Sequence, residues 1–182
     1  MRHPTFELIT LLLVTACTDQ STSPLVEANA PRAQVGQGRI VHRVSVGGPD
    51  QCSSLGLKPG CDGSFSLVAM QWEDGSVTGE FTDSYGGPGA LHATVDCLLV
   101  QVIPERTTLE AWVGGVMTHP KEAAGHRVIT RMRDNGTSKN DPRPDAISRG
   151  IVDPERENVS SNCQDKPDMG FAQALQGQVT IW

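Results

Sequence analysis

The side chains of this chain that are best suited to bind an ion lie in one polar segment, residues 134–145. Carboxylate and amide oxygens are the ligands that Ca²⁺ prefers. The spacing differs from that of an EF-hand loop, and two basic residues dilute the negative charge. In the alternative interpretation, Asx turns and proline residues stiffen a connector. Calcium is therefore a hypothesis and no other cofactor is expected. Its candidate ligands are Asp134, Asn135, Asn140, Asp141 and Asp145.

The histidines form no catalytic motif in the sequence. The signatures of serine hydrolases, zinc proteases and phosphate-binding loops are absent. His92 and Asp96 share one face of a predicted strand, but they lie four positions apart, about 13 Å along the strand, which is too far for a hydrogen-bonded dyad. We interpret this face as solvated, which favours a binding protein over an enzyme.

The first residues predict export from the cell. A basic start and a short apolar stretch within residues 1–16 are typical of a secretory signal and too short to span a membrane. The stretch ends in Val14-Thr15-Ala16-Cys17, which resembles the bacterial lipobox. That resemblance implies that Cys17 becomes the lipidated first residue of the mature protein. Because Thr18 replaces the Asp that often retains such proteins at the inner membrane, an outer-membrane location is favoured.

The other four cysteines predict structural disulfide bonds, because they are an even number in an exported chain. Cys52 and Cys61 flank a loop that contains glycine and proline, so they can bond locally. That pairing leaves Cys97, in a predicted strand, for Cys163, in a polar loop. A zinc site is less consistent with the sequence, since no two cysteines have the short spacing typical of such sites.

Charge and composition divide the chain into a tether and one domain. The formal net charge of −6 over 182 residues makes nucleic acid an unfavourable partner. Residues 17–38 are rich in small polar residues and contain no aromatic residue, which predicts a flexible tether after the signal peptide, residues 1–16. Residues 39–182 hold the apolar segments that can form a core, so they are predicted to be one β-domain.

Alternation of apolar and polar residues predicts about eight short antiparallel strands and no long helix. Asp74-Gly75 lies between two such segments and predicts a hairpin with a type I′ turn. In residues 91–99 the apolar face is predicted to run from Leu91 to Leu99 at every second residue and to include Cys97. In residues 107–118, Gly114-Gly115 predicts a bulge or bend. Alternating arginines in residues 127–133 predict a basic stripe on the outer sheet face, interpreted as solvated.

Strand-like segments open and close the domain, at residues 39–46 and 178–182. Pairing between them would close a small barrel and remove exposed edges. We therefore predict an all-β closed barrel, with a two-sheet sandwich as the alternative.

Several motifs, in this order along the chain, resemble a group of small exported bacterial β-domain proteins that are mostly uncharacterised. The resemblance implies the fold and the location and supplies no catalytic residues. A cysteine before the last strand also occurs in that group, which supports the pairing of Cys97 with Cys163. The motifs are Gly63-Ser64-Phe65-Ser66, Asp74-Gly75-Ser76-Val77-Thr78-Gly79-Glu80-Phe81, Leu91-His92-Ala93-Thr94-Val95-Asp96-Cys97-Leu98, Ala111-Trp112-Val113-Gly114-Gly115-Val116, Asp134-Asn135-Gly136, Pro144-Asp145-Ala146-Ile147-Ser148 and Val179-Thr180.

These observations favour a cell-envelope lipoprotein, attached to the membrane through its lipid, whose β-domain binds a protein or small-molecule partner without catalysis. An extracytoplasmic hydrolase with an unrecognised site and a purely structural surface protein are the alternatives. The sequence identifies no specific ligand.

Overall fold

The computed structural model describes residues 38–49, 64–84, 90–105, 108–136, 143–172 and 178–182. All of them belong to one compact unit, residues 33–182. The described residues form antiparallel strands and short 3₁₀ helices and contain no α-helix, which confirms the predicted all-β class.

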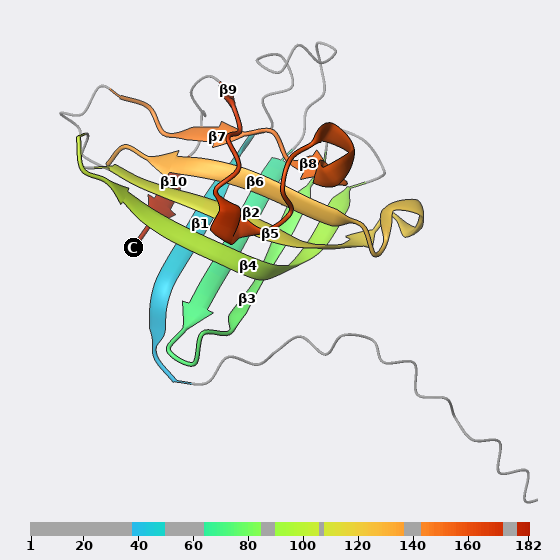
Figure 1. Ribbon diagram of the computed structural model, residues 1–182, viewed down its shortest axis with the longest axis horizontal. Helices are drawn as coiled ribbons and strands as arrows, with labels where there is room; N and C mark the ends of the chain where they lie inside the picture. The colour runs from blue at the N-terminus through green and yellow to red at the C-terminus, as the bar shows by residue number, and fades with distance from the viewer. Residues whose placement is uncertain (1–37, 50–63, 85–89, 106–107, 137–142, 173–177) are drawn as a thin grey trace, which may run out of the picture. The chain divides into compact units, whose positions relative to one another are not determined.

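The elements follow one another along the chain as labelled in Figure 1. The strands are β1 (Ile40–Pro49), β2 (Ser64–Trp72), β3 (Val77–Asp83), β4 (Leu91–Ile103), β5 (Thr108–His119), β6 (Arg127–Asp134), β7 (Ala146–Ser148), β8 (Ile151–Val152), β9 (Phe171–Ala172) and β10 (Gln178–Ile181). The 3₁₀ helices are η1 (Lys121–Ala123), η2 (Pro154–Glu157) and η3 (Cys163–Asp165).

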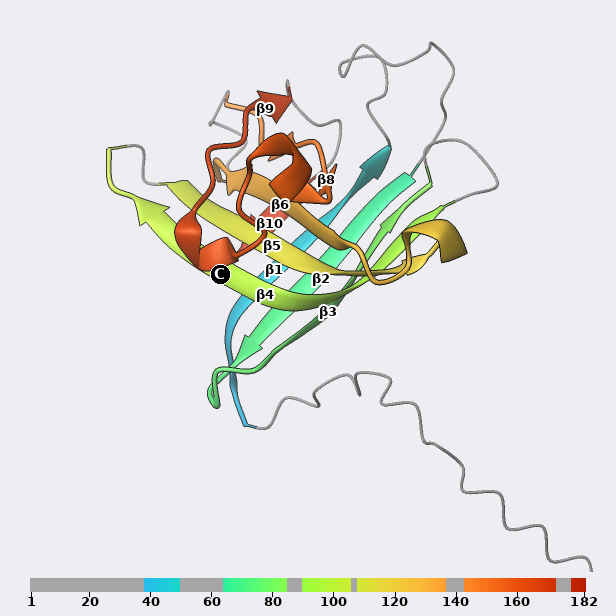
Figure 2. The same ribbon diagram turned by 45° about the vertical axis from the view of Figure 1, so that its right-hand side comes forward.

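The described strands form one ten-stranded antiparallel sheet, which curves into a nearly closed eight-stranded barrel (Figures 1 and 2). The order of neighbours is β10, β1, β2, β3, β4, β5, β6, β7 and then β9, while β8 pairs with β6. The first and last strands pair as predicted, with Val44 opposite Ile181 and Val46 opposite Val179. The structure is therefore the barrel and not the alternative sandwich.

Side chains fill the barrel interior. Alternating residues of the long strands point inward and are almost completely buried, among them Val44, Leu67, Phe81 and Val113. The space that remains between them is about 10 Å³, which is too small for any ligand larger than a single water. The interior is therefore a packed core and not a binding cavity.

The predicted hairpin between β2 and β3 forms, but its turn differs from the predicted type. Trp72 O accepts a hydrogen bond from Gly75 N, and Trp72 N donates to Ser76 O, so residues 73–75 form a three-residue loop. Gly75 has a φ of +83°, whereas Asp74 keeps a negative φ. This is a turn followed by a left-handed glycine, not the two-residue type I′ turn. The Asp74 carboxylate accepts a hydrogen bond from Ser76 N and so stabilises this turn.

A bulge in β4 overturns the predicted faces of that strand. The register shifts between Val95 and Cys97, so Asp96 has no partner of its own on β5. Beyond this point Leu98 points into the barrel, while Cys97 and Leu99 pack on the outer side. One extra residue therefore moves the cysteine from the core face to the outer face.

The bulge predicted from Gly114-Gly115 lies on the neighbouring strand instead. Both glycines are on β5, opposite the β4 bulge. A Cβ atom on Gly115 would lie 2.3 Å from Thr94 O, and one on Gly114 would lie 3.2 Å from Cys163 Sγ. The glycines therefore leave room for the bulged backbone and for the disulfide bond.

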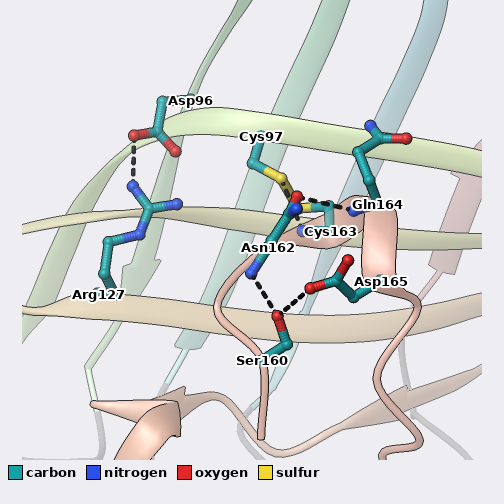
Figure 3. The surroundings of a disulfide bond; sticks show 8 residues. All are labelled: Asp96, Cys97, Arg127, Ser160, Asn162, Cys163, Gln164 and Asp165. Atoms are coloured by element: carbon teal, nitrogen blue, oxygen red, sulfur yellow. Dashed lines mark hydrogen bonds and ion pairs between the residues drawn. A yellow bond between two sulfur atoms is a disulfide. The ribbon is translucent and has the colours of Figure 1, made fainter.

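β8 and the chain that follows it as far as β9 form a second layer on the outer face of β4, β5 and β6 (Figure 2). Its apolar core consists of Trp112 and Ile129 from the sheet and Ile151, Cys163 and Met169 from the layer. The Cys97–Cys163 disulfide fastens the layer to β4 (Figure 3), which confirms that predicted pair. Cys52 and Cys61 lie outside the described residues.

The predicted basic stripe is not a solvated face. Glu110 on β5 is 1% exposed, and it accepts hydrogen bonds from Arg131 Nε at 3.0 Å and Arg133 Nε at 2.6 Å. Both guanidinium groups also stack on the ring of Phe171, at 4.6 and 4.4 Å. Arg127 pairs with the bulge residue Asp96. The arginines therefore neutralise carboxylates beneath and beside the outer layer.

Replacing both Cys97 and Cys163 by alanine should lower the free energy of unfolding by about 4 kcal/mol in the loop-entropy model, because the bond closes a long loop. The two cysteines are 66 residues apart in sequence. Urea denaturation of the oxidised protein and the variant, followed by circular dichroism, measures the difference. A variant that unfolds at the same urea concentration would show that packing alone holds the layer.

Candidate functional site

A polar groove lies on the outer face of the barrel, over β3, β4 and β5. Its volume is about 310 Å³, and it is open to solvent. Phe81 and Ala93 of the lining point into the core, so their neighbours along the strands face outward. The polar side chains of the groove are Glu80, Thr82, His92, Thr94, Thr118 and His119.

A second bulge, at the end of β5, brings two histidines together in this groove. Ala93 pairs with Met117, but His92 pairs with His119, so Thr118 is the extra residue. Thr118 and His119 are both exposed and both line the groove, on the side of His92. The two imidazole rings are 5.7 Å apart between centroids. Thr118 Oγ1 donates to the backbone oxygen of His92 at 3.2 Å and so ties the bulge to β4.

Thr82 contacts the first of these histidines. Its Oγ1 lies 3.4 Å from His92 Nδ1, on the neighbouring strand where the two residues pair. A hydroxyl beside an imidazole is one half of a nucleophile and base arrangement. The distance exceeds the hydrogen-bond length such a pair uses, and within the described residues no carboxylate is bonded to the His92 ring. The groove therefore presents imidazole, hydroxyl and carboxylate groups to solvent.

A second imidazole and carboxylate pair lies elsewhere. His126 Nδ1 is 2.6 Å from Asp153 Oδ1, and Arg156 Nε is 3.4 Å from the other carboxylate oxygen. In the described part of the chain no Ser, Thr or Cys side chain is hydrogen-bonded to this imidazole. The pair therefore fastens η2 to the chain just before β6.

Three of the five candidate calcium ligands lie together at the seam of the barrel. Asp134 accepts hydrogen bonds from Gly136 N at 2.8 Å and from Ile181 N at 2.9 Å, one on each carboxylate oxygen. Asp145 accepts from Asn135 N at 3.0 Å and from Val179 N at 2.8 Å. Asn140 and Asp141 lie outside the described residues.

These two carboxylates complete the hydrogen bonding of β10. Trp182 and Arg43 exchange two backbone hydrogen bonds, so Trp182 N points toward β1. The N–H groups of Val179 and Ile181 point to the opposite edge, where none of the described strands pairs with β10. Asp134 and Asp145 provide the acceptors there. Calcium binding by the segment stays a prediction, but the described carboxylates already have a structural role.

The remaining predicted site residue, Cys17, lies outside the described residues. Among the residues that are described, none of the helices has the length and apolar character needed to cross a membrane.

The groove was not predicted from the sequence, because its two histidines are brought together by a bulge at the end of β5. The predicted strand ended at Thr118, and His92 was grouped with Asp96 along its own strand. The one available signal was the adjacent pair Thr118-His119 directly before Pro120, where a strand must stop its regular hydrogen bonding.

Fold and site together define a small antiparallel β-barrel with a filled interior, a disulfide-fastened outer layer and a polar groove on its outer face. The chain matches no protein-family model, and no curated protein or solved structure is significantly similar to it.

Replacing Asp145 by alanine should destabilise the protein by about 1–3 kcal/mol, because the N–H groups of Asn135 and Val179 lose their acceptor. Urea denaturation measures the loss, and hydrogen exchange at Val179 should accelerate more than exchange in β3. Glu122→Ala removes an exposed carboxylate on η1 and serves as the control. Unchanged exchange at Val179 would show that the carboxylate does not hold β10.

Proposed function

We propose that this chain is an exported, lipid-anchored protein of the bacterial cell envelope whose β-barrel binds a partner or ligand without catalysis. The groove over β3, β4 and β5 is the observation that carries the binding role. It gathers two imidazoles, three hydroxyls and one carboxylate in about 310 Å³.

The packed interior is evidence that any binding surface lies on the outside of the barrel. Barrels that hold a ligand inside need a cavity, and the space left among the core side chains here is about 10 Å³. Within the part of the chain that the structure describes, the side-chain polar groups of Thr94, His92 and His119 make no hydrogen bond beyond the long contact between Thr82 and His92. Those groups are therefore available to a partner that enters the groove.

The cysteines support the envelope location. A disulfide between residues far apart in sequence suits an oxidising compartment outside the cytoplasm. The lipobox-like Val14-Thr15-Ala16-Cys17 adds the anchor, with the outer membrane favoured by Thr18. Residues 17–38 would then hold the barrel at a distance from the bilayer.

Native protein should partition into detergent with an acyl-modified Cys17 at its N-terminus, and Cys17→Ser should abolish the modification and release the protein from membranes. Mass spectrometry of the N-terminal peptide and membrane fractionation measure both effects. Native protein that lacks lipid, or that starts at another residue, would overturn the anchor.

A photoreactive benzoylphenylalanine at Thr94, which lines the groove on β4, should cross-link to a discrete envelope component in intact cells. The same amino acid at Gln164, which is exposed on η3 over the outer layer, is the matched control. Mass spectrometry identifies the adducts. Identical adduct patterns, or none at either position, would favour a purely structural protein.

A further inference from the structure

The geometry points to a two-histidine site for a divalent transition-metal ion in the groove, with His92 and His119 as its protein ligands. This inference rests on the proposed binding role of the groove and names the class of ligand. Neutral imidazole is the most common protein ligand for Zn²⁺, Cu²⁺ and Ni²⁺.

The distance between the rings suits one shared ion. Two imidazoles that bind a tetrahedral ion at the usual Zn–N length have ring centroids about 5 Å apart. The ring centroids of His92 and His119 are 5.7 Å apart in an edge-to-face arrangement, and both side chains are exposed, so rotation about their side-chain bonds can bring one nitrogen of each onto the same ion. The rings stand on opposed residues of β4 and β5, which fixes this spacing in the backbone.

Thr82 orients the first ligand. A metal-bound histidine normally donates the N–H of its other nitrogen to a neighbouring oxygen, which fixes the tautomer. Thr82 Oγ1 lies 3.4 Å from His92 Nδ1, so an Nδ1–H can donate to it and leave Nε2 free for the ion. Thr82 is thus a positioning residue.

Glu80 adds negative charge to the same groove and lies two residues from Thr82 along β3. Within the described residues no three His, Cys, Asp or Glu side chains form a ready-made metal site. The pair therefore supplies two ligands, and water or a group of an incoming ligand completes the coordination. Such an open site fits the capture of a metal ion or of a ligand that carries one.

The bulge at Thr118 places His119 beside His92. In a regular ladder, pairing of Ala93 with Met117 would place Thr118 opposite His92 and turn His119 to the core side. The extra residue instead brings Thr118 and His119 to the outer side together. Bulges of this kind are frequent where a strand must re-aim a side chain at a functional site.

The test is a titration of full-length, untagged protein with Zn²⁺, followed by calorimetry and by the histidine signals in NMR spectra. Wild type should bind one ion with the His92 and His119 signals shifting together, and Mg²⁺ should shift neither. His92→Ala and His119→Ala should each weaken binding by at least about tenfold. Thr82→Val should weaken it less, by a few-fold, with unchanged thermal stability.

His126→Ala, which removes a histidine outside the groove, is the matched control and should bind like wild type. Absence of saturable Zn²⁺ binding by wild type, or equal binding by the variant that lacks both His92 and His119, would overturn the site. These outcomes are separate from the proposed function, because cross-linking from Thr94 and acylation of Cys17 can succeed without metal.

Discussion

The barrel depends on acceptors for the buried backbone N–H groups at its seam, and here two carboxylates provide them. The last strand of the described chain pairs with β1 on one edge and with no strand on the other. Asp134 and Asp145 accept the two N–H groups on that second edge. A charged acceptor forms a stronger hydrogen bond than a carbonyl does, and a buried N–H without an acceptor is costly. The packing of the interior depends on this closure, because β10 carries Val179 and Ile181 into the core.

Two bulges then give the outer surface its character. The bulge at Asp96 turns Cys97 outward, so that the chain after β8 can be bonded to the sheet and can cover Glu110 and its arginines. The bulge at Thr118 puts His119 beside His92. Each adds a single residue to one strand, and each changes which side chains share a face. A groove and a covered face thus lie at opposite ends of the same two strands.

The amino-acid pattern was sufficient for the class of fold, the strands and the pairing of the first strand with the last, because period-2 alternation records which face is buried. It was insufficient where one residue breaks the period. Alternation from Leu91 to Leu99 predicted Cys97 on the core face. Residues 97–100 are all apolar, so their sequence does not show that the bulge at Asp96 exchanges the two faces of the strand. The seam was hidden for another reason. Asp134 and Asp145 are typical turn residues, and only the folded chain brings them to Val179 and Ile181.

The antiparallel pairing of β1 with β10 also sets the order of events in folding. Val44 meets Ile181, so the first strand acquires its outer neighbour only after residues as far as Trp182 have been synthesised. Until then β1 has an unpaired edge, and the hairpins from β2 to β6 are the local structure that can form first. Contacts between such distant residues form slowly, and an unpaired edge invites pairing with other chains. The edge of β1 therefore stays exposed until residues 178–182 are available to pair with it.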